Sequence, residues 1–428
     1  MIDIVIKNVQ VFAGDGKQPV QTDIAINNGK IVSIGHADCE CERVIDGNGQ
    51  AACPGFIDMH SHSDLRVMQQ PPPEEKLRQG ITIELYGQDG LGVAPMRRVD
   101  VPTMSALVSG LNGSITERDW CWDSFADYLE KLETYVLPVN AAVLASHGPI
   151  RMQVLGMSDR QPDTEETHAL SDILEQAFNE GAFGFSTGLI YPPCSFASTE
   201  ELIAYNKVAA RHDAPFVVHQ RDEGYRIRQS FTELLEIARR TGVHLHVSHL
   251  QANGRINWHL MDDILAMADN HISTGGRISW DRYPYIAGCT VLSAVLPQWT
   301  FAGGTEALIK NLNDRVFRQR IHEDFTKDLE VWNNRSITIG WHNIFVTSVQ
   351  TEGNKWMEGN HIAELSDITR KHPVDVLCDV LAEEKLAVTM VIFYGSEDVL
   401  EKVLTHPAAT VGTDGVYASK PHPRLFGC

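Results

Sequence analysis

Six residues of the chain have the types and the positions needed to bind one or two metal ions. The set consists of His60, His62, Asp89, His219, His249 and Asp414. His60 and His62 are two positions apart, so in a strand both side chains point to the same side. The other four stand at or just beyond the ends of apolar runs of strand length. Imidazole and carboxylate groups together form a ligand set suited to zinc or a similar divalent ion.

A single histidine is weak evidence for a metal site, because the chain contains 18 of them. His244 and His246 repeat the spacing of His60 and His62, but they precede the end of an apolar run, and we interpret them as structural. The alternative for the whole set is scattered structural histidines, and for Asp414 an ordinary turn residue. A metal site is favoured because the selected residues recur at the same position in successive strand units, namely the end of the strand.

The elements that must position these residues are apolar runs that alternate with helical patterns from about residue 51 onward. Such runs are typical of parallel strands covered on both faces, and eight of them predict an α/β fold of the (β/α)8, TIM-like barrel type. The C-terminal ends of all strands in such a barrel meet at one mouth, where active sites lie. The runs are 51–62, 81–88, 141–147, 184–187, 215–219, 243–249, 277–283 and 408–414.

Residues 1–50 follow a different pattern from the rest of the chain. They show period-2 alternation interrupted by turn sequences such as Asn27-Asn28-Gly29, which predicts a small antiparallel β unit. We therefore expect an N-terminal part of a small β domain, followed by a barrel over residues 51–428. Two long stretches, at about 90–138 and 286–380, interrupt the strand–helix alternation and are expected to be insertions around the barrel mouth.

Composition excludes several classes of protein. The 428 residues are 43% hydrophobic and 21% charged, as in a globular protein, and no apolar run approaches a membrane span. A net charge of −20 disfavours nucleic acid and anionic membranes as partners. The eight cysteines are scattered, and the N-terminus lacks the pattern of a signal peptide, so we expect a reduced, cytoplasmic protein.

An ordered set of segments resembles the amidohydrolase superfamily, and within it the N-acyl-D-amino-acid deacylases (D-aminoacylases). The segments include PGFIDMHSHSD, EGAFGFSTGLIYPP, VVHQRDEG, HVSHLQANG, WDRYPYIAG and VGTDGVYASKPHPRLFG. The resemblance implies an amidohydrolase-type barrel preceded by part of a small β-sandwich. Chains of that family continue past the PHPR segment, whereas this one ends fourteen residues after Asp414, so the resemblance implies a C-terminal truncation.

The resemblance also assigns the six candidates to two metal positions. One position takes His60, His62 and Asp414, and the other, usually the tightly held zinc, takes His219 and His249. The family places a cysteine between the two positions, and Asp89 stands there in this chain. A carboxylate can also bridge two ions, but it is a harder ligand. The expected cofactor is one tightly bound Zn²⁺, and a second divalent ion is left open.

Substrate contacts follow from the same resemblance. Arg424 and Tyr283 resemble the residues that hold the substrate α-carboxylate, although Tyr283 could instead be a core aromatic residue. Gln251 replaces a lysine and Cys289 replaces a serine of the family. The loss of one cation and one hydroxyl predicts weaker carboxylate binding or a different head group. Arg424 is then the main cation that the sequence offers for this role.

The expected reaction is hydrolysis of the amide bond of N-acyl-D-amino acids, which releases a D-amino acid and a carboxylate. The metal would activate a water molecule, and Asp414 would act as general base and then as general acid. One alternative is a hydrolase of cyclic amides, in the manner of hydantoinases and dihydroorotases. Another is a barrel without catalytic activity. The substrate would be a small molecule; the sequence fixes neither its side chain and acyl group nor the oligomeric state.

Overall fold

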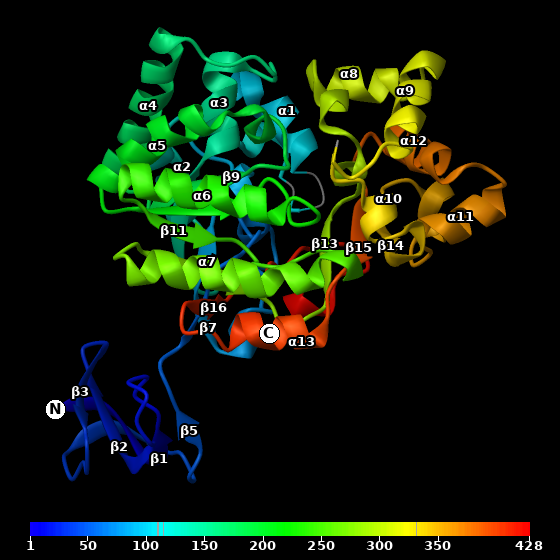
Figure 1. Ribbon diagram of the computed structural model, residues 1–428. Helices are drawn as coiled ribbons and strands as arrows, with labels where there is room; N and C mark the ends of the chain where they lie inside the picture. The colour runs from blue at the N-terminus through cyan, green and yellow to red at the C-terminus, as the bar shows by residue number, and fades with distance from the viewer. Residues whose placement is uncertain (109–110, 114, 331) are drawn as a thin grey trace. The chain divides into compact units, whose positions relative to one another are not determined.

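The computed structural model describes residues 1–108, 111–113, 115–330 and 332–428 (Figure 1). The chain divides into two compact units, Met1–Phe56 and Ile57–Cys428. The insertions predicted at about 90–138 and 286–380 include residues 109, 110, 114 and 331, which lie outside the described residues.

The N-terminal unit is a five-stranded sheet. Its strands are β1 (Ile2–Val11), β2 (Val20–Asn27), β3 (Lys30–Ile34), β4 (Cys41–Asp46) and β5 (Ala51–Ala52). Neighbours β1, β2 and β3 pair antiparallel as predicted, but β4 and β5 pair with β1 in parallel, so the prediction of a wholly antiparallel unit was wrong. The reason is that residues 35–40 return the chain to the start of β1, where Cys41 pairs with Ile2.

The second unit contains eight parallel strands, which confirms the predicted barrel. The strands are β6 (Phe56–Asp58), β7 (Ile81–Tyr86), β8 (Asn140–Ser146), β9 (Gly184–Gly188), β10 (Pro215–His219), β11 (His244–Val247), β12 (Ile278–Arg282) and β16 (Ala409–Val411). They are ordered β16-β12-β11-β10-β9-β8-β7-β6. The first and last strands meet through a parallel bridge between Ser61 and Gly415, and the Asp414 N–H donates to the His60 carbonyl at 2.8 Å. These contacts bring the two ends of the sheet together.

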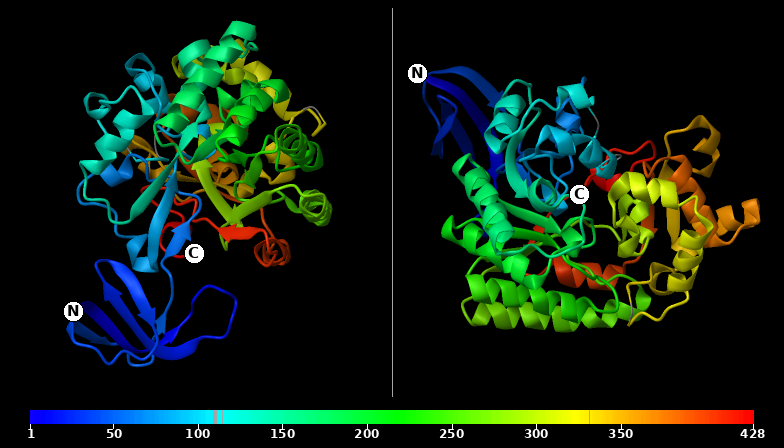
Figure 2. Two further views of the ribbon diagram at one scale, coloured as in Figure 1. Left: turned by 90° about the vertical axis from the view of Figure 1, so that its left-hand side faces the viewer. Right: turned by 90° about the horizontal axis from the view of Figure 1, so that it is seen from above.

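Helices cover the outside of the barrel strands (Figures 1 and 2). They are α2 (Phe125–Glu133), α3 (His147–Leu155), α4 (Thr164–Asn179), α5 (Thr199–Arg211), α6 (Ile227–Thr241), α7 (Met261–Ser273) and α13 (Glu397–Leu404). Helix α1 (Val101–Leu107) instead contacts α8 (Gly304–Asn311). In α6 the buried residues Ile227, Phe231, Leu234 and Ala238 recur at helical spacing, so one face packs against the strands. The N-terminus of α4 is fixed by a capping box between Asp163 and Glu166.

A second sheet lies in the segment between β12 and β16. It consists of β13 (Ala287–Val291), β14 (Ile344–Ser348) and β15 (Thr389–Phe393), in the antiparallel order β13-β15-β14. The helices of this segment are α8 (Gly304–Asn311), α9 (Arg315–Phe325), α10 (Arg335–Thr338), α11 (Ile362–Thr369) and α12 (Pro373–Glu383). Sheet and helices share a hydrophobic core that includes Leu308, Val346 and Leu377. This segment therefore has its own packing and presents β13 and β15 to the site described below.

None of the helices in the described part of the chain combines the length and the apolar character needed to cross a membrane.

Candidate metal centre and catalytic cavity

The six predicted ligands all lie at the C-terminal ends of barrel strands. His60 and His62 follow β6, Asp89 lies in the turn after β7, and His219 is the last residue of β10. His249 and Asp414 come two and three residues after the ends of β11 and β16. Parallel strands thus deliver residues from opposite ends of the chain to one mouth, as the sequence pattern predicted.

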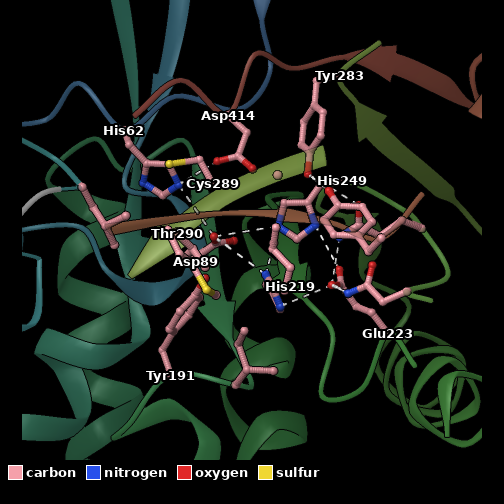
Figure 3. Close-up of a pocket in the computed structure, with 18 of the residues that line it drawn as sticks. His62, Asp89, Tyr191, His219, Glu223, His249, Tyr283, Cys289, Thr290 and Asp414 are labelled. Atoms are coloured by element: carbon pink, nitrogen blue, oxygen red, sulfur yellow. Dashed lines mark hydrogen bonds and ion pairs between the residues drawn. The ribbon is translucent and has the colours of Figure 1, made fainter. Parts of the chain in front are cut away.

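Asp89 joins two groups of potential ligands (Figure 3). On one side, His219 Nδ1 and His249 Nε2 are 2.9 Å apart, and each lies 3.9 Å from Asp89 Oδ2. On the other side, His60 Nε2 and His62 Nε2 both lie 3.7 Å from the same oxygen. Asp414 Oδ1 lies 3.8 Å from His60 Nε2 and 3.3 Å from His62 Nε2. The geometry brings all six candidates together, with Asp89 between the two groups.

The arrangement fits a bound divalent cation. Nitrogen and oxygen ligands at about 2.0–2.2 Å from a tetrahedral ion stand about 3.3–3.6 Å apart, close to the separations found here. His60 Nε2 and Asp89 Oδ1 are buried without a hydrogen-bond partner, and such groups are rare in folded proteins. Apart from the His219–His249 pair, which is at hydrogen-bond distance, and the His62–Asp414 pair at 3.3 Å, the donors converge at 3.7–3.9 Å, which is too long for hydrogen bonds and suitable for ligands of a shared ion.

The charges of the cluster also favour a bound cation. Burial lowers the pKa of His219 to about 4, so its imidazole is neutral at pH 7, the form that binds a metal. Burial opposes ionisation of Asp89, yet His60 and His249 lower the pKa of this carboxyl below its ordinary value. Burial also disfavours protonated His60, but the carboxylates of Asp281, Asp89 and Asp414 outweigh it and raise the pKa of His60 to about 10. The carboxylates thus favour a positive charge at their centre, which a divalent ion supplies.

Three of the six residues adopt backbone conformations that are unusual for residues other than glycine. The φ angles of Asp89, His249 and Asp414 are 57°, 33° and 47°. Such conformations cost free energy and cluster at functional sites. Gly188, in the GFSTG segment, permits one of them, because a Cβ atom there would lie 2.4 Å from the Asp89 carbonyl oxygen.

Glu223 supports the His219–His249 pair and was not identified from the sequence. Its Oε1 lies 3.1 Å from His249 Nδ1, and its Oε2 lies 3.9 Å from His219 Nε2. The side-chain amides of Gln251 and Asn253 both donate to Glu223 Oε2 at 2.9 Å. Glu223 therefore contacts the nitrogen of each ring that faces away from Asp89, as a residue that fixes ring orientation does. Its place four residues after His219 was the available signal.

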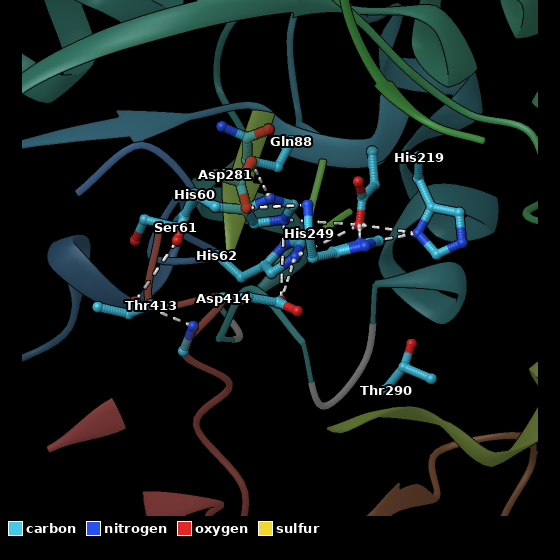
Figure 4. Close-up of polar contacts among 12 residues, drawn as sticks. His60, Ser61, His62, Gln88, His219, His249, Asp281, Thr290, Thr413 and Asp414 are labelled. Carbon is cyan, nitrogen blue, oxygen red and sulfur yellow. Dashed lines mark hydrogen bonds and ion pairs between the residues drawn. The ribbon is translucent and has the colours of Figure 1, made fainter. Parts of the chain in front are cut away.

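Asp281 lies beside His60 and His249 (Figure 4), and Asn112 supports His62. Asp281 Oδ2 lies 3.3 Å from His60 Nδ1 and 3.2 Å from His246 Nε2, and Oδ1 accepts the His249 N–H at 2.9 Å. Asn112 Oδ1 lies 3.1 Å from His62 Nδ1. The sequence analysis missed both residues, although Asp281 ends an apolar run. His246, which we interpreted as structural, contacts Asp281 rather than the two ligand groups.

The cluster forms one wall of a cavity between the barrel and the second sheet. Other walls include Tyr191, Tyr283, Gln251 and Asn253, together with residues of β13 and β15. Three of the four predicted substrate contacts, Tyr283, Gln251 and Cys289, line this cavity.

Arg424, the fourth predicted contact, is fully buried beside the cavity and already has partners. Its Nη1 lies 2.8 Å from Asp414 Oδ2, and its Nη2 donates to the Cys289 carbonyl at 2.8 Å. The guanidinium also lies over the Tyr283 ring, at 4.4 Å from the centroid. Among the described residues, the one arginine or lysine that lines the cavity is Arg335, which the sequence analysis did not identify.

Comparisons with known proteins agree with this architecture. The model of the amidohydrolase family matches residues 43–424. D-aminoacylase from Alcaligenes xylosoxydans xylosoxydans is 27% identical over 99% of this chain and 77% of that protein. N-acyl-D-glutamate deacylase from the same organism is 28% identical over 100% of this chain and 76% of that protein.

Solved structures show the same similarity. The N-acyl-D-glutamate deacylase of Bordetella bronchiseptica, complexed with zinc and a phosphonate mimic of the tetrahedral intermediate, is 25% identical. It superposes with a TM-score of 0.81 over 100% of this chain and 79% of that chain. The fold of a D-aminoacylase crystal structure matches with a TM-score of 0.77 at 24% identity, over 100% of this chain and 79% of that chain. The fold and the site are thus those of a metal-dependent hydrolase built on a barrel. The chain belongs to the amidohydrolase family.

Proposed function

We propose that the protein is a metal-dependent amidohydrolase that hydrolyses the amide bond of N-acyl-D-amino acids. The observation that carries the proposal is the buried cluster in which Asp89 joins two pairs of imidazoles at the barrel mouth. The relatives that match nearly the whole chain are named for the deacylation of D-amino acids, and one solved relative contains zinc. The substrate is a small molecule that enters the cavity beside this cluster.

The chain's own residues fit the metal that this function requires. His219, His249 and Asp89 would hold the tight ion. His60, His62 and Asp414 would hold a second one, and Asp89 also lies within reach of His60 and His62. A bound zinc ion lowers the pKa of a coordinated water and polarises a substrate carbonyl. Glu223 and Asp281 fix the rings of the imidazoles that bind it.

Asp414 is the proposed proton carrier. Its Oδ1 faces the imidazoles of His60 and His62, and its Oδ2 is held by Arg424. Burial would raise the pKa of Asp414, but Arg424 and His60 together lower it, so the carboxylate is ionised at neutral pH and can accept a proton. It takes the proton of the attacking water at the strand end and returns it to the leaving nitrogen.

Tyr283, Gln251, Cys289 and Arg424 are proposed to form the end of the cavity that receives the α-carboxylate. Gln251 is fixed in place, since its amide donates to Glu223 and its oxygen accepts from Arg282 at 2.5 Å. Burial raises the pKa of the Cys289 thiol to about 11, so this residue is neutral at pH 7 and a weak donor. Arg424 carries the positive charge at this end.

Hydrolysis of N-acetyl-D-amino acids, their L enantiomers and hydantoin by the metal-loaded protein tests the proposal. We expect turnover of D substrates at least about tenfold above L, because only one hand places the amide at the cluster while the α-carboxylate meets Arg424; such a ratio corresponds to about 1.4 kcal/mol of differential binding. Turnover of hydantoin without turnover of acyl-amino acids would instead favour a cyclic-amide hydrolase. No turnover of any amide would support a barrel without catalysis.

A further inference from the structure

Arg335 has an unusual environment for a buried arginine. It is the first residue of α10, its side chain lines the cavity that holds the imidazole cluster, and its exposed fraction is 8%. The Nη1 group donates to the Ala294 carbonyl at 3.0 Å. No carboxylate of the described residues lies within 4.0 Å of its guanidinium. The planar fork therefore has N–H groups left over and no negative partner.

Two other buried arginines have a carboxylate partner, whereas the buried Arg282 donates to Gln251 Oε1 and to the Tyr285 carbonyl. Arg151 donates to Glu201 at 3.1 Å, and Arg424 lies 2.8 Å from Asp414. Burying a guanidinium without an anion costs several kcal/mol, so proteins rarely keep one without a reason. An anion that enters the cavity would pair with Arg335 as Glu201 pairs with Arg151.

Arg335 and Arg424 act on different sides of the cavity. Arg424 contacts Asp414, Cys289 and Tyr283, which form the proposed α-carboxylate end. Arg335 lies at the side of the cavity that borders a second cavity, and Ile190 lines both cavities with it. Figure 3 shows Asp414 and Tyr283 on one side of the cavity and Tyr191 on the other, with His219 between Tyr191 and Glu223.

Arg335 also lies at a boundary of the cavity that the side chain of a bound amino acid could reach. It lines a second cavity together with Ile190, Arg221 and Trp299, and it separates that cavity from the one beside the imidazoles. A side chain that extends from the bound amino acid toward this boundary would meet a guanidinium rather than an apolar wall. Carboxylates are the groups that a planar guanidinium binds in a bidentate manner.

We propose that Arg335 binds the side-chain carboxylate of the substrate, so the preferred substrates are N-acyl derivatives of acidic D-amino acids. This inference rests on the proposed function and narrows it to dicarboxylates. One carboxylate meets the Arg424 end and the other meets Arg335, while the amide lies at the imidazole cluster between them. Two relatives that match the whole chain are named for D-glutamate and D-aspartate derivatives.

The test is a comparison of kcat/KM for N-acetyl-D-glutamate and N-acetyl-D-glutamine, which differ in the charge of one group. We expect the parent protein to prefer the glutamate derivative, and Arg335→Met to lower its kcat/KM by about 10²-fold while changing the glutamine derivative less than about threefold. Arg335→Lys keeps the charge but not the planar fork, so it should show a smaller loss confined to the acidic substrate. It also replaces Arg335→Met if that variant does not fold.

Arg320→Met is the matched control. Arg320 belongs to the same inserted segment, is exposed, and lies 3.6 Å from the centroid of the Trp299 ring, where it lines the second cavity only. Its replacement should leave the preference unchanged. The assignment is overturned if Arg335→Met loses the same activity on both substrates or leaves the preference unchanged. It is also overturned if the selective loss occurs in Arg320→Met instead. A parent protein that hydrolyses neutral D substrates well would sink the inference alone, whereas one that hydrolyses no acyl-D-amino acid would sink the proposed function.

Discussion

Asp89 is the residue that the two groups of potential ligands share. Its Oδ2 is the common neighbour of four imidazoles, at 3.7–3.9 Å from each. The family motif places a soft thiolate at this point, and the carboxylate here is a harder ligand. The chemistry of one atom therefore decides which metals the centre selects.

Asp89→Cys should shift metal selectivity toward zinc. Thiolates favour zinc over manganese, whereas carboxylates accept both. We expect the parent protein, dialysed against equimolar Zn²⁺ and Mn²⁺, to retain a higher Mn:Zn ratio than the variant does. Metal analysis after dialysis measures this ratio, with Glu201→Gln as a control that removes a buried carboxylate outside the imidazole cluster. Equal ratios in the parent and in Asp89→Cys would contradict the bridging role.

Glu223→Gln should weaken metal binding by about 10–100-fold, the usual effect of removing a residue that orients a ligand. The amide keeps the size of the side chain but removes the negative charge that lies 3.1 Å from His249 Nδ1. Competition with a chelator of known affinity measures the change. Glu236→Gln, an exposed acid on α6 whose side chain is 45% exposed, is the control and should bind metal as the parent does. Unaltered affinity in Glu223→Gln would reject the orienting role.

The sequence could indicate the ligands but not the residues that orient them. His60, His219 and the other ligands recur at strand ends, and that phase is visible in a single chain. Glu223 and Asp281 act through the second nitrogen of each ring, which depends on side-chain rotamers that periodicity does not encode. Arg335 belongs to an inserted segment, and its approach to the cavity depends on how that segment packs.

At the scale of elements, Lys76 holds together the first and last strands of the barrel. It is fully buried between β6 and β7, and its Nζ contacts Asp58 and Thr413 and lies 3.6 Å from Glu84 Oε1. Burial disfavours the charged amine, but Asp58 and Glu84 outweigh this and raise the pKa of Lys76. Asp58 belongs to β6, Glu84 to β7, and Thr413 follows β16.

Lys76→Met should therefore lower the free energy of unfolding by about 3–5 kcal/mol, since two buried carboxylates lose their cation. Urea unfolding followed by circular dichroism measures the loss. Lys402→Met serves as the control, because Lys402 pairs with Asp262 at the surface of α13, where the side chains are 51% and 65% exposed. Its effect should stay below about 1 kcal/mol. Similar small losses in both variants would show that Lys76 does not hold the barrel ends.

Glu201 links α5 to α3 and gives stability a dependence on pH. Burial would raise its pKa, but His147 and Arg151 outweigh that effect and lower it. A carboxyl whose pKa is lowered by folding stabilises the protein above the unfolded pKa of about 4.3, and this contribution is lost as pH falls. Glu201→Gln should cost about 3 kcal/mol at pH 7.

The difference in free energy of unfolding between the parent and Glu201→Gln should stay constant from pH 7 to about pH 5 and shrink as pH falls below about 4.3. Urea unfolding at several pH values measures it, and Glu236→Gln again serves as the exposed control. A difference that stays constant or grows below about pH 4.3 would show that the charge of Glu201 is not the stabilising feature.

Elements that repeat along the chain were predictable, and elements formed by distant segments were not. All eight barrel strands overlap the apolar runs named from the sequence, because each run is long enough to be recognised alone. The second sheet pairs β13 with β15, and β14 with β15, across about 45–100 residues of intervening chain. The parallel pairing of β4 with β1 likewise depends on where a loop returns, which local turn chemistry does not specify.

At the scale of the whole molecule, two properties of the chain support the same function. The net charge of −20 disfavours polyanionic partners, so a small anionic substrate needs specific cations such as Arg335 in the cavity wall and Arg424 beside the cavity. The barrel brings residues from position 60 to position 414 to one mouth, which requires the complete strand order of the second unit. Metal binding and activity should therefore appear and disappear together.

Metal content and hydrolysis of N-acetyl-D-glutamate, measured on the same preparations of the parent protein and of His219→Ala, test the central claim most directly. His219 supplies a neutral imidazole 2.9 Å from that of His249, so its removal takes away a ligand of the tight ion. We predict that the parent holds at least one zinc equivalent per chain and releases D-glutamate, and that His219→Ala loses most of both. Full metal occupancy in the variant, or turnover in a parent protein stripped of metal, would contradict a metal-dependent deacylase with this centre.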